Sequence, residues 1–308
     1  MSAAFNGAKF CWMDGKVVET EQALVSAMEP IYLGIFEGIK AYKQEHLEGE
    51  GKLSVFSWDQ HMERLWRSAA IDGLKIPYNR NVLLDGLRAV VMANDFKSNI
   101  YIQPRIWPRA EDHENVHVVI PVWKFNTILP STNPEFSKKR RYMVSSWRRV
   151  SSDALPPQAK SWANYANSNL AAREAKRCGY DSALFLDNRG FVSEGTGACV
   201  MIVRDGRLIT PPVTASILES VTRGLFLGFV PLDLGIPTEV RDLTRSELYA
   251  AEEVFLCGTG GEVTPISSVD DIVVGMEYPG PITRRIADYY SEIIVGNLDK
   301  YRCRLTNL

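Results

Sequence analysis

Three segments far apart in the chain carry side chains that could serve one organic cofactor. Lys160 lies in an apolar segment, Glu194 precedes Gly-Thr-Gly, and Thr259 is flanked by glycines. A lysine can form an imine with an aldehyde, a carboxylate can face a ring nitrogen, and backbone amides can hold a phosphate. Pyridoxal phosphate requires these three interactions of a protein. We therefore expect the three segments to form a site for this cofactor.

The neighbours of Lys160 make it a candidate for imine formation. Most lysines lie on protein surfaces, but the segment 154–160 is apolar and contains two consecutive prolines. Burial disfavours the ammonium form of a lysine, and the free amine can then attack an aldehyde. Five residues later, Tyr165 could direct its hydroxyl toward the phenolic oxygen of the cofactor. The alternative for Tyr165 is an interior aromatic residue whose hydroxyl bonds elsewhere.

Glu194 lies between the strand-like residues 190–193 and the flexible Gly195-Thr196-Gly197. Pyridoxal chemistry requires a protonated ring nitrogen, so that the ring can accept electrons from a carbanion. A partly buried carboxylate beside that nitrogen would keep the proton in place. The alternative is an exposed turn residue, so the interpretation of Glu194 depends on the presence of Lys160 and Thr259.

Three further features could bind the phosphate group. Thr259 follows the apolar run 254–257 inside a glycine cluster, where the backbone can approach an anion and the threonine adds a hydroxyl donor. Val221 and Thr222 begin a predicted helix, and the amides of a helix N-terminus attract anions. Arg64, on another predicted helix, could form a charge-assisted hydrogen bond with the same phosphate. Each feature alone is also typical of an ordinary turn or of a solvated helix.

The composition disfavours several classes of protein. The chain has 308 residues, of which 45% are apolar and 23% charged, as is typical of globular proteins. Its formal net charge of −2 argues against nucleic-acid binding. The five cysteines and four histidines lack paired spacing, so we expect neither disulfides nor a metal site. No apolar run approaches the roughly 20 residues that span a bilayer, and no signal-peptide pattern is present, which favours a cytoplasmic location.

The hydrophobic periodicity predicts an α/β chain of the α+β type with two domains. Residues 1–128 form a small N-terminal domain, residues 129–137 a turn-rich linker, and residues 138–308 a larger domain. Strands are expected at 9–13, 16–19, 32–42, 53–56, 99–106, 116–122, 141–146, 182–186, 198–203 and 254–257. Helices are expected at 62–69, 82–93, 164–178, 218–230 and 282–295.

Taken in order, the segments resemble the branched-chain amino acid aminotransferases, which are class IV pyridoxal phosphate enzymes. The motifs that carry the resemblance are the opening hairpin, FEGIKAY at 36–42, HMERL at 61–65, VSSWR at 144–148, AK at 159–160, NY at 164–165, SEG at 193–195, TR at 222–223, EVFLCGT at 253–259 and EVTP at 262–265. The resemblance implies fold type IV, with a small N-terminal α+β domain and a larger C-terminal domain that has a mixed, barrel-like sheet with helices. It also implies pyridoxal 5'-phosphate as cofactor and a homodimer with residues of both chains at the active site.

The same resemblance implies a role for individual residues. Lys160 corresponds to the Schiff-base lysine, Glu194 to the partner of the pyridine nitrogen, and Tyr165 to the partner of the phenolic oxygen. The positions expected to bind phosphate are Arg64, Val221, Thr222 and Thr259. The positions expected to meet the substrate are Tyr32, Phe36, Tyr101, Gln103, Arg105, Thr259 and Gly260.

Three departures from the family pattern lie at or near the substrate positions. Branched-chain members carry a tyrosine-x-arginine pair on a strand, and here Gln103 replaces the arginine. If Tyr101, Gln103 and Arg105 share one face of a strand, Arg105 could supply the missing charge. The segment 32–36 is one residue shorter than expected, and 218–220 differs from many relatives. These changes leave the imine chemistry intact but leave the amino donor open.

We therefore expect an aminotransferase that works by a ping-pong Schiff-base mechanism, with a 2-oxo acid such as 2-oxoglutarate as acceptor. Lys160 would hold the cofactor and, as a free amine, move the proton at the substrate α-carbon. A branched-chain L-amino acid is the favoured donor, and D-amino acids and (R)-amines are the alternatives. A lyase similar to aminodeoxychorismate lyase would use the same lysine. A non-catalytic binding protein is disfavoured because every core cofactor position is present.

Overall fold

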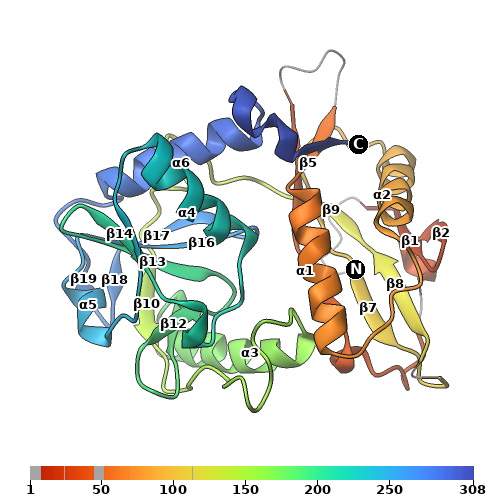
Figure 1. Ribbon diagram of the computed structural model, residues 1–308, viewed down its shortest axis with the longest axis horizontal. Coiled ribbons are helices and arrows are strands. Elements are labelled where there is room, and N and C mark those ends of the chain that lie inside the picture. Colours follow the sequence, from red (N-terminus) through yellow and green to blue (C-terminus); the bar gives the residue numbers. More distant parts are fainter. Residues whose placement is uncertain (1–7, 24, 45–51, 113) are drawn as a thin grey trace. The chain divides into compact units, whose positions relative to one another are not determined.

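The computed structural model describes residues 8–308 except 24, 45–51 and 113 (Figure 1). The chain divides into two compact units. Unit 1 comprises Met1–Thr127, Ala159–Ala163 and Glu292–Leu308, and unit 2 comprises Ile128–Gln158 and Asn164–Ser291. The domains expected from the sequence are continuous ranges, whereas unit 1 also contains the later segments Ala159–Ala163 and Glu292–Leu308. These two segments belong to unit 1 because their backbones pair with strands of that unit, Ser161 with Ile35 and residues 305–307 with residues 54–56.

The described residues of unit 1 form two sheets and two complete α-helices. Its strands are β1 Phe10–Met13, β2 Lys16–Glu19, β3 Ile35–Phe36, β4 Ile39–Lys43, β5 Leu53–Phe56, β6 Ile100–Ile102, β7 Arg105–Pro108, β8 Val116–Ile120, β9 Val122–Lys124 and β20 Leu305–Asn307. Its helices are α1 Trp58–Ile71 and α2 Arg80–Asn94, with 3₁₀ turns η2 Thr20–Gln22, η3 Ile31–Leu33 and η5 Asp299–Arg304. In the described part of the chain the sheet orders are β2-β1-β8-β7-β3 and β20-β5-β4-β6-β9.

Helix α1 buries one face in the core of unit 1. Trp58, Met62, Leu65 and Ala69 recur at helical spacing, and none is more than 3% exposed. They belong to one hydrophobic cluster with residues of α2 and of both sheets. Burial of this stripe favours the helix over the coil, because most helix stability in proteins comes from packing of an apolar face. Helix α1 is therefore a fixed support for any polar residue on the same buried face.

Unit 2 is built on a mixed sheet. Its strands are β10 Arg141–Val144, β11 Ser182–Leu186, β12 Val192–Gly195, β13 Cys199–Arg204, β14 Arg207–Thr210, β15 Thr238–Val240, β16 Glu253–Gly258, β17 Glu262–Ile266, β18 Ser268–Val269 and β19 Ile272–Val273. Its helices are α4 Val221–Asp233 and α5 Arg245–Tyr249, most of α3 Trp162–Arg177 and of α6 Pro281–Ile294, and the 3₁₀ turn η4 Val213–Ala215. None of the helices in the described residues is long and apolar enough to cross a lipid bilayer.

The strand order of unit 2 brings distant parts of the chain together. The sheet runs β15-β14-β13-β12-β11-β10-β18-β19, and β16 pairs with both β13 and β17. Strand β10 is parallel to β11 and β18, and β14 is parallel to β15, whereas the remaining pairs are antiparallel. Apolar residues from these strands and from α5 form one core. The ends of β12 and β16 are thereby held on one framework.

Two strands expected from the sequence are interrupted in the structure. The expected strand 32–42 contains η3, β3 and β4, with breaks at Gly34 and Gly38. A Cβ atom at Gly38 would lie 2.0 Å from the Tyr101 hydroxyl oxygen, so the close approach requires glycine. The expected strand 99–106 ends as β6 before Pro104 and resumes as β7 in the other sheet, because proline cannot donate to a ladder.

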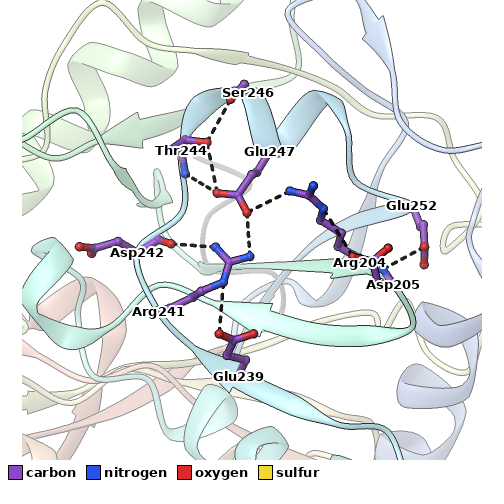
Figure 2. A network of polar contacts seen from close by, with 9 residues as sticks. All are labelled: Arg204, Asp205, Glu239, Arg241, Asp242, Thr244, Ser246, Glu247 and Glu252. Atoms are coloured by element: carbon purple, nitrogen blue, oxygen red, sulfur yellow. Dashed lines mark hydrogen bonds and ion pairs between the residues drawn. The ribbon is translucent and has the colours of Figure 1, made fainter.

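A polar network joins α5 to the sheet of unit 2 (Figure 2). The carboxylate of Glu247 accepts a hydrogen bond from the Thr244 backbone at 3.0 Å and one from Arg241 at 2.7 Å. It also accepts a hydrogen bond from Arg204, at 3.3 Å. Thr244 and Glu247 form a capping box at the start of α5. The network therefore connects this short helix to β13 and to the loop after β15.

Candidate active site

In unit 1, the backbone on both sides of the Lys160 side chain is anchored to strand β3 and its preceding glycine. The Phe36 N–H donates to the Lys160 carbonyl at 3.0 Å, and the Trp162 N–H donates to the Gly34 carbonyl at 2.9 Å. Ile35 and Ser161 form an antiparallel bridge between these bonds. The segment that contains the lysine thus behaves as a short extra strand on β3. This pairing fixes the position of the Lys160 backbone, from which the side chain extends.

The Lys160 side chain lies beside an aromatic stack. Its Nζ is 4.6 Å from the centre of the Phe36 ring, and the residue is only 9% exposed. Phe36 in turn stacks on Trp162 with ring centres 4.0 Å apart and planes 18° apart. Such rings limit the access of water to the amine. The structure therefore brings together Lys160 and Phe36, which were both expected in the site.

Arg64 lies on the buried face of α1 in an ion pair that the sequence did not predict. Its Nε is 2.7 Å from Glu37 Oε1, and its Nη2 is 2.7 Å from Glu37 Oε2. His61 Nδ1 lies 2.9 Å from Glu37 Oε2. Burial by itself would raise the pKa of Glu37, but the charge of Arg64 and hydrogen bonds from Arg64 and His61 outweigh it, so this pKa lies below its usual range. Burial also lowers the pKa of His61, which favours the neutral imidazole.

A polar stripe on α1 connects this ion pair to the lysine segment. His61, Arg64 and Ser68 are three or four residues apart, so they lie along one side of the helix. The Ser68 hydroxyl accepts a hydrogen bond from the Lys160 N–H at 3.0 Å. Buried polar residues at helical spacing inside an otherwise apolar face were the signal in the sequence that could have identified His61 and Ser68. No comparable signal marked Glu37, since its charged and ring partners Arg64 and His61 are 27 and 24 residues away.

The expected substrate residues of unit 1 occupy two sheets rather than one strand. Tyr101 is on β6 and stacks on Trp123, with ring centres 4.9 Å apart. Arg105 begins β7, so the expectation that these residues share one strand face is wrong, because Pro104 interrupts the strand. Arg105 and Gln103 nevertheless meet, since Arg105 Nε donates to Gln103 Oε1 at 2.8 Å. Burial lowers the pKa of Arg105, and its guanidinium lies 5.5 Å from the Trp162 ring centre.

Tyr32 differs from these residues in its exposure. It lies in η3 rather than on the expected strand, and it is 67% exposed in this structure. Because η3 directly precedes Gly34 and β3, Tyr32 is on the same chain segment as Phe36. No hydrogen bond of its hydroxyl contributes to the argument for a substrate role.

In unit 2, Glu194 is a buried carboxylate with a cation beside it. It lies on β12 and is 5% exposed. Its Oε1 is 2.9 Å from Arg149 Nε, and its Oε2 accepts a hydrogen bond from the Leu218 N–H at 3.3 Å. Both oxygens thus have a positively polarised neighbour, an arrangement that favours the ionised form. Arg149 was not identified from the sequence.

The start of α4 offers backbone amides to an anion. Val221 and Thr222 are its first two residues, and Ser220 caps the helix by accepting a hydrogen bond from the Arg223 N–H at 3.2 Å. Thr222 is 3% exposed. The helix begins three residues later than expected, because residues 218 and 219 precede the cap Ser220 and the Leu218 N–H instead donates to Glu194. This hydrogen bond connects the carboxylate to the segment before the helix N-terminus.

Thr259 and Gly260 form part of the turn between β16 and β17. The two strands pair up to Gly258 and Glu262, which leaves three residues in the turn. The Thr264 hydroxyl donates to the Gly261 carbonyl at 2.8 Å and closes the turn. Thr259 is half-buried and Gly260 is exposed. Tyr165, the remaining expected cofactor residue, is half-buried in the first turns of α3.

The expected site residues are therefore divided between the two units. Those of unit 1 are Tyr32, Phe36, Arg64, Tyr101, Gln103, Arg105 and Lys160, and those of unit 2 are Tyr165, Glu194, Val221, Thr222, Thr259 and Gly260. Each set contains buried polar groups held by several hydrogen bonds or ion pairs. A buried amine in one set and a buried carboxylate in the other are the two reactive groups that the sequence led us to expect.

Comparison with known proteins assigns the chain to a family. The family model of amino-transferase class IV matches residues 34–269. The chain belongs to the class IV aminotransferases. This class depends on pyridoxal phosphate, so the expectations of an aminotransferase and of this cofactor are confirmed for the family. The expected fold type IV is also confirmed.

Curated relatives and a solved structure agree with this assignment. The chain is 33% identical over 307 residues to a probable branched-chain-amino-acid aminotransferase of Aquifex aeolicus, with 96% of each chain covered. It is 34% identical over 304 residues to the branched-chain-amino-acid aminotransferase of Escherichia coli, with 95% of each chain covered. The branched-chain amino acid aminotransferase of Thermobaculum terrenum, solved in its PLP form, has a TM-score of 0.90 and 34% identity and covers 98% of this chain and 99% of its own. The resemblance inferred from the motifs is thus confirmed.

Proposed function

We propose that this class IV aminotransferase transfers the amino group of a branched-chain L-amino acid to a 2-oxo acid such as 2-oxoglutarate, with Lys160 as the catalytic lysine. The observation that carries the proposal is the buried position of the Lys160 amine against Phe36, on a backbone segment anchored from both sides. An amine kept from water in this way is suited to nucleophilic attack on an aldehyde. The branched-chain donor follows from the names of the relatives, which share about a third of their residues with this chain.

The residues present fit pyridoxal phosphate. The bound cofactor would supply an electron-accepting ring that stabilises negative charge at the substrate α-carbon. Lys160 would bind its aldehyde carbon, Glu194 would accept a hydrogen bond from its protonated ring nitrogen, and Tyr165 would meet its phenolic oxygen. The phosphate would be bound by Arg64, by the amides and hydroxyl of Val221 and Thr222, and by Thr259. The buried carboxylate of Glu194 between Arg149 and the Leu218 amide supports this assignment, because that environment favours an anion.

In this proposal Lys160 also moves the proton during the reaction. When its amine is free, Lys160 would take up the proton at the substrate α-carbon and hold it for return later in the cycle. The Phe36 and Trp162 rings exclude water from this amine. The second half of the cycle, with the 2-oxo acid, would reverse these transfers and complete a ping-pong sequence.

The substrate side chain would lie among apolar and aromatic groups. Phe36, Tyr101 and the exposed aromatic Tyr32 are the candidate contacts in unit 1, and Thr259 and Gly260 are those in unit 2. Arg105, oriented by its bond to Gln103, would bind the α-carboxylate. Apolar contacts together with one cation would suit an aliphatic amino acid.

The remaining parts of the proposal come from the family resemblance. We propose that the enzyme acts as a homodimer in the cytoplasm, and that its functional domains correspond to residues 1–128 and 138–308 with a linker at 129–137. Light scattering of the purified protein tests the dimer. A mass of about twice 34.6 kDa is expected, and the mass of a single chain would contradict this part.

Two measurements test the central proposal. Borohydride reduction of the cofactor-loaded protein, followed by peptide mapping, is expected to place the label on Lys160, and a label elsewhere or none would overturn the assignment. The second measurement is amino transfer from L-leucine, L-isoleucine, D-alanine and (R)-phenylethylamine to 2-oxoglutarate and pyruvate. Faster transfer from the first two donors is expected. Preference for D-alanine or for (R)-phenylethylamine would mean that the donor is a D-amino acid or an (R)-amine rather than a branched-chain L-amino acid. Release of pyruvate from a chorismate-derived amine, without amino transfer, would indicate a lyase.

A further inference from the structure

Arg149 is a buried cation at the end of the loop that follows β10. It is 5% exposed, and its backbone N–H donates to the Leu186 carbonyl on β11 at 2.9 Å. Its Nε lies 2.9 Å from Glu194 Oε1 on β12, but the N–H is not directed at that oxygen, so the contact is an ion pair without a hydrogen bond. The guanidinium also lies 5.7 Å from the ring centre of Phe185. Arg149 is therefore fixed against the strands that carry Glu194.

The other end of the same guanidinium contacts the beginning of α3. Its Nη1 donates to the Asn164 carbonyl at 3.4 Å and to Asn167 Oδ1 at 3.3 Å. The Asn167 side chain also accepts the Val150 N–H at 3.2 Å and donates to the Arg148 carbonyl at 3.0 Å. These bonds attach the loop around Arg149 to the first turns of α3. Tyr165 lies between the two asparagines on this stretch of helix.

A purely structural role does not account well for this arrangement. Taking a guanidinium and a carboxylate out of water costs several kcal/mol per ion, and apolar residues of similar size are often at least as stabilising. The Nε–H does not form a hydrogen bond with the nearby Glu194 carboxylate, and two of the contacts of Arg149 are long hydrogen bonds. The pair is therefore poorly optimised for stability. What it does provide is a positive charge beside Glu194 and a connection to the helix that carries Tyr165.

We propose that Arg149 is a positioning residue for the pyridine ring, which keeps Glu194 ionised toward the ring nitrogen and holds the Tyr165 turn of α3 beside it. This inference rests on the proposed function, because Glu194 and Tyr165 are there the two ring contacts. A buried carboxylate without a neighbouring cation tends to take up a proton. A protonated Glu194 could no longer accept a hydrogen bond from a protonated ring nitrogen, so the nitrogen would lose its proton and the ring would withdraw electrons less strongly. The Leu218 N–H donates to the other oxygen, at 3.3 Å.

The experiment uses the full-length holoenzyme loaded with cofactor that carries ¹⁵N in the ring. The variants are Arg149→Met, Arg149→Lys, Glu194→Gln and the double variant Arg149→Met/Glu194→Gln. Arg148→Met is the matched control, since Arg148 is the exposed neighbour. The ¹⁵N chemical shift reports the protonation of the ring nitrogen, and steady-state kinetics separate kcat from KM for the amino donor.

In the wild type and in Arg148→Met, the ring nitrogen is expected to be protonated. In Arg149→Met it is expected to lose the proton, with kcat reduced about 10²-fold and KM changed less than about 3-fold. Arg149→Lys, which keeps the charge, should restore at least a tenth of the wild-type kcat. In the Glu194→Gln background, Arg149→Met should reduce kcat by less than about 3-fold further, because Arg149 acts through that carboxylate.

A protonated ring nitrogen in Arg149→Met would overturn the inference. So would a double variant whose loss of kcat equals the product of the losses of the two single variants. Absence of a lysine–cofactor bond in the wild type would instead overturn the proposed function, so the two failures are distinguishable. If Arg149→Met does not fold, the decision passes to Arg149→Lys. A ring nitrogen that stays protonated in that variant, with kcat at a tenth of the wild-type value or more, supports the positioning role, and a ring that loses its proton although the lysine keeps the charge contradicts it.

Discussion

The Glu37 carboxylate and the Arg64 guanidinium form a two-pronged ion pair with both nitrogen–oxygen distances at 2.7 Å. Glu37 has no exposed surface and Arg64 is 4% exposed. The parallel fork geometry orients the guanidinium plane more strongly than a single contact would. Because Arg64 is a proposed phosphate ligand, the residue that orients it is one that the sequence motifs alone did not reveal.

Removal of the Glu37 charge is expected to destabilise unit 1. Glu37→Gln leaves a buried guanidinium without its carboxylate, which typically costs about 3–5 kcal/mol. Chemical denaturation followed by circular dichroism measures the change. Glu63→Gln, at an exposed position of the same helix α1, is the matched control and should change stability by less than about 0.5 kcal/mol. Equal stability of the two variants would contradict the importance of the ion pair.

The network around Glu247 predicts a loss of stability in acid (Figure 2). Burial alone would raise the pKa of Glu247, but hydrogen bonds from Arg241 and Thr244 lower it from 4.5 to about 2. A group with a depressed pKa in the folded state stabilises the protein above its unfolded pKa, and this contribution disappears as the pH falls through the folded value. The contribution of Glu247 is therefore complete at neutral pH and lost between about pH 4.5 and pH 2.

Glu247→Gln tests this pH dependence. Loss of the charge that binds Arg241 and Arg204 should lower stability by about 1–2 kcal/mol at neutral pH, whereas glutamine can still form the capping box. The difference in melting temperature between variant and wild type should shrink as the pH is lowered toward 3. Asp205→Asn is the control, because Asp205 is 86% exposed and its contact with Arg204 is 3.9 Å long. A difference that stays constant with pH would show that ionisation of Glu247 does not matter.

Replacement of the catalytic lysine should abolish transfer without unfolding the chain. Lys160→Ala removes the only group proposed to bind the aldehyde and to move the proton, so kcat should fall by at least about 10⁴-fold. The borohydride label should disappear at the same time. Lys176→Ala, at an exposed position on α3, should keep both activity and label. Retention of the label in the Lys160 variant would mean that another amine binds the cofactor.

Arg105 is expected to distinguish donors that carry a carboxylate from those that do not. Arg105→Gln should raise KM for L-leucine about 10- to 100-fold, since a charge-assisted hydrogen bond is worth roughly 1.5–3 kcal/mol. The KM for (R)-phenylethylamine, which has no carboxylate, should change little. Gln103→Leu, which removes the 2.8 Å bond that orients Arg105, should have a smaller effect in the same direction. If the KM values of both donors change equally, Arg105 stabilises the fold and does not bind the carboxylate of the donor.

The types of the reactive residues and the main elements around them could be predicted from the sequence. Lys160, Glu194 and Thr259 were identified because few residue types can form an imine, face a pyridine nitrogen or hold a phosphate. Helices α2 and α3 were predicted to within two residues, because an apolar stripe at helical spacing is a local property of the chain. Local patterns of this kind depend on neighbours within a few positions, so they can be read without a structure.

The tertiary structure alone decided which residues become partners. Glu37 meets Arg64 across 27 residues, and Arg149, which follows β10, meets Glu194 on β12 across 45 residues of the chain. The break at Pro104 moved Arg105 to another sheet, yet the side chain of Gln103 still reaches it. Long-range contacts depend on strand order and register, which arise from the packing of the whole unit. Side-chain chemistry is thus set by the sequence, whereas the charge beside each reactive group is set by the fold.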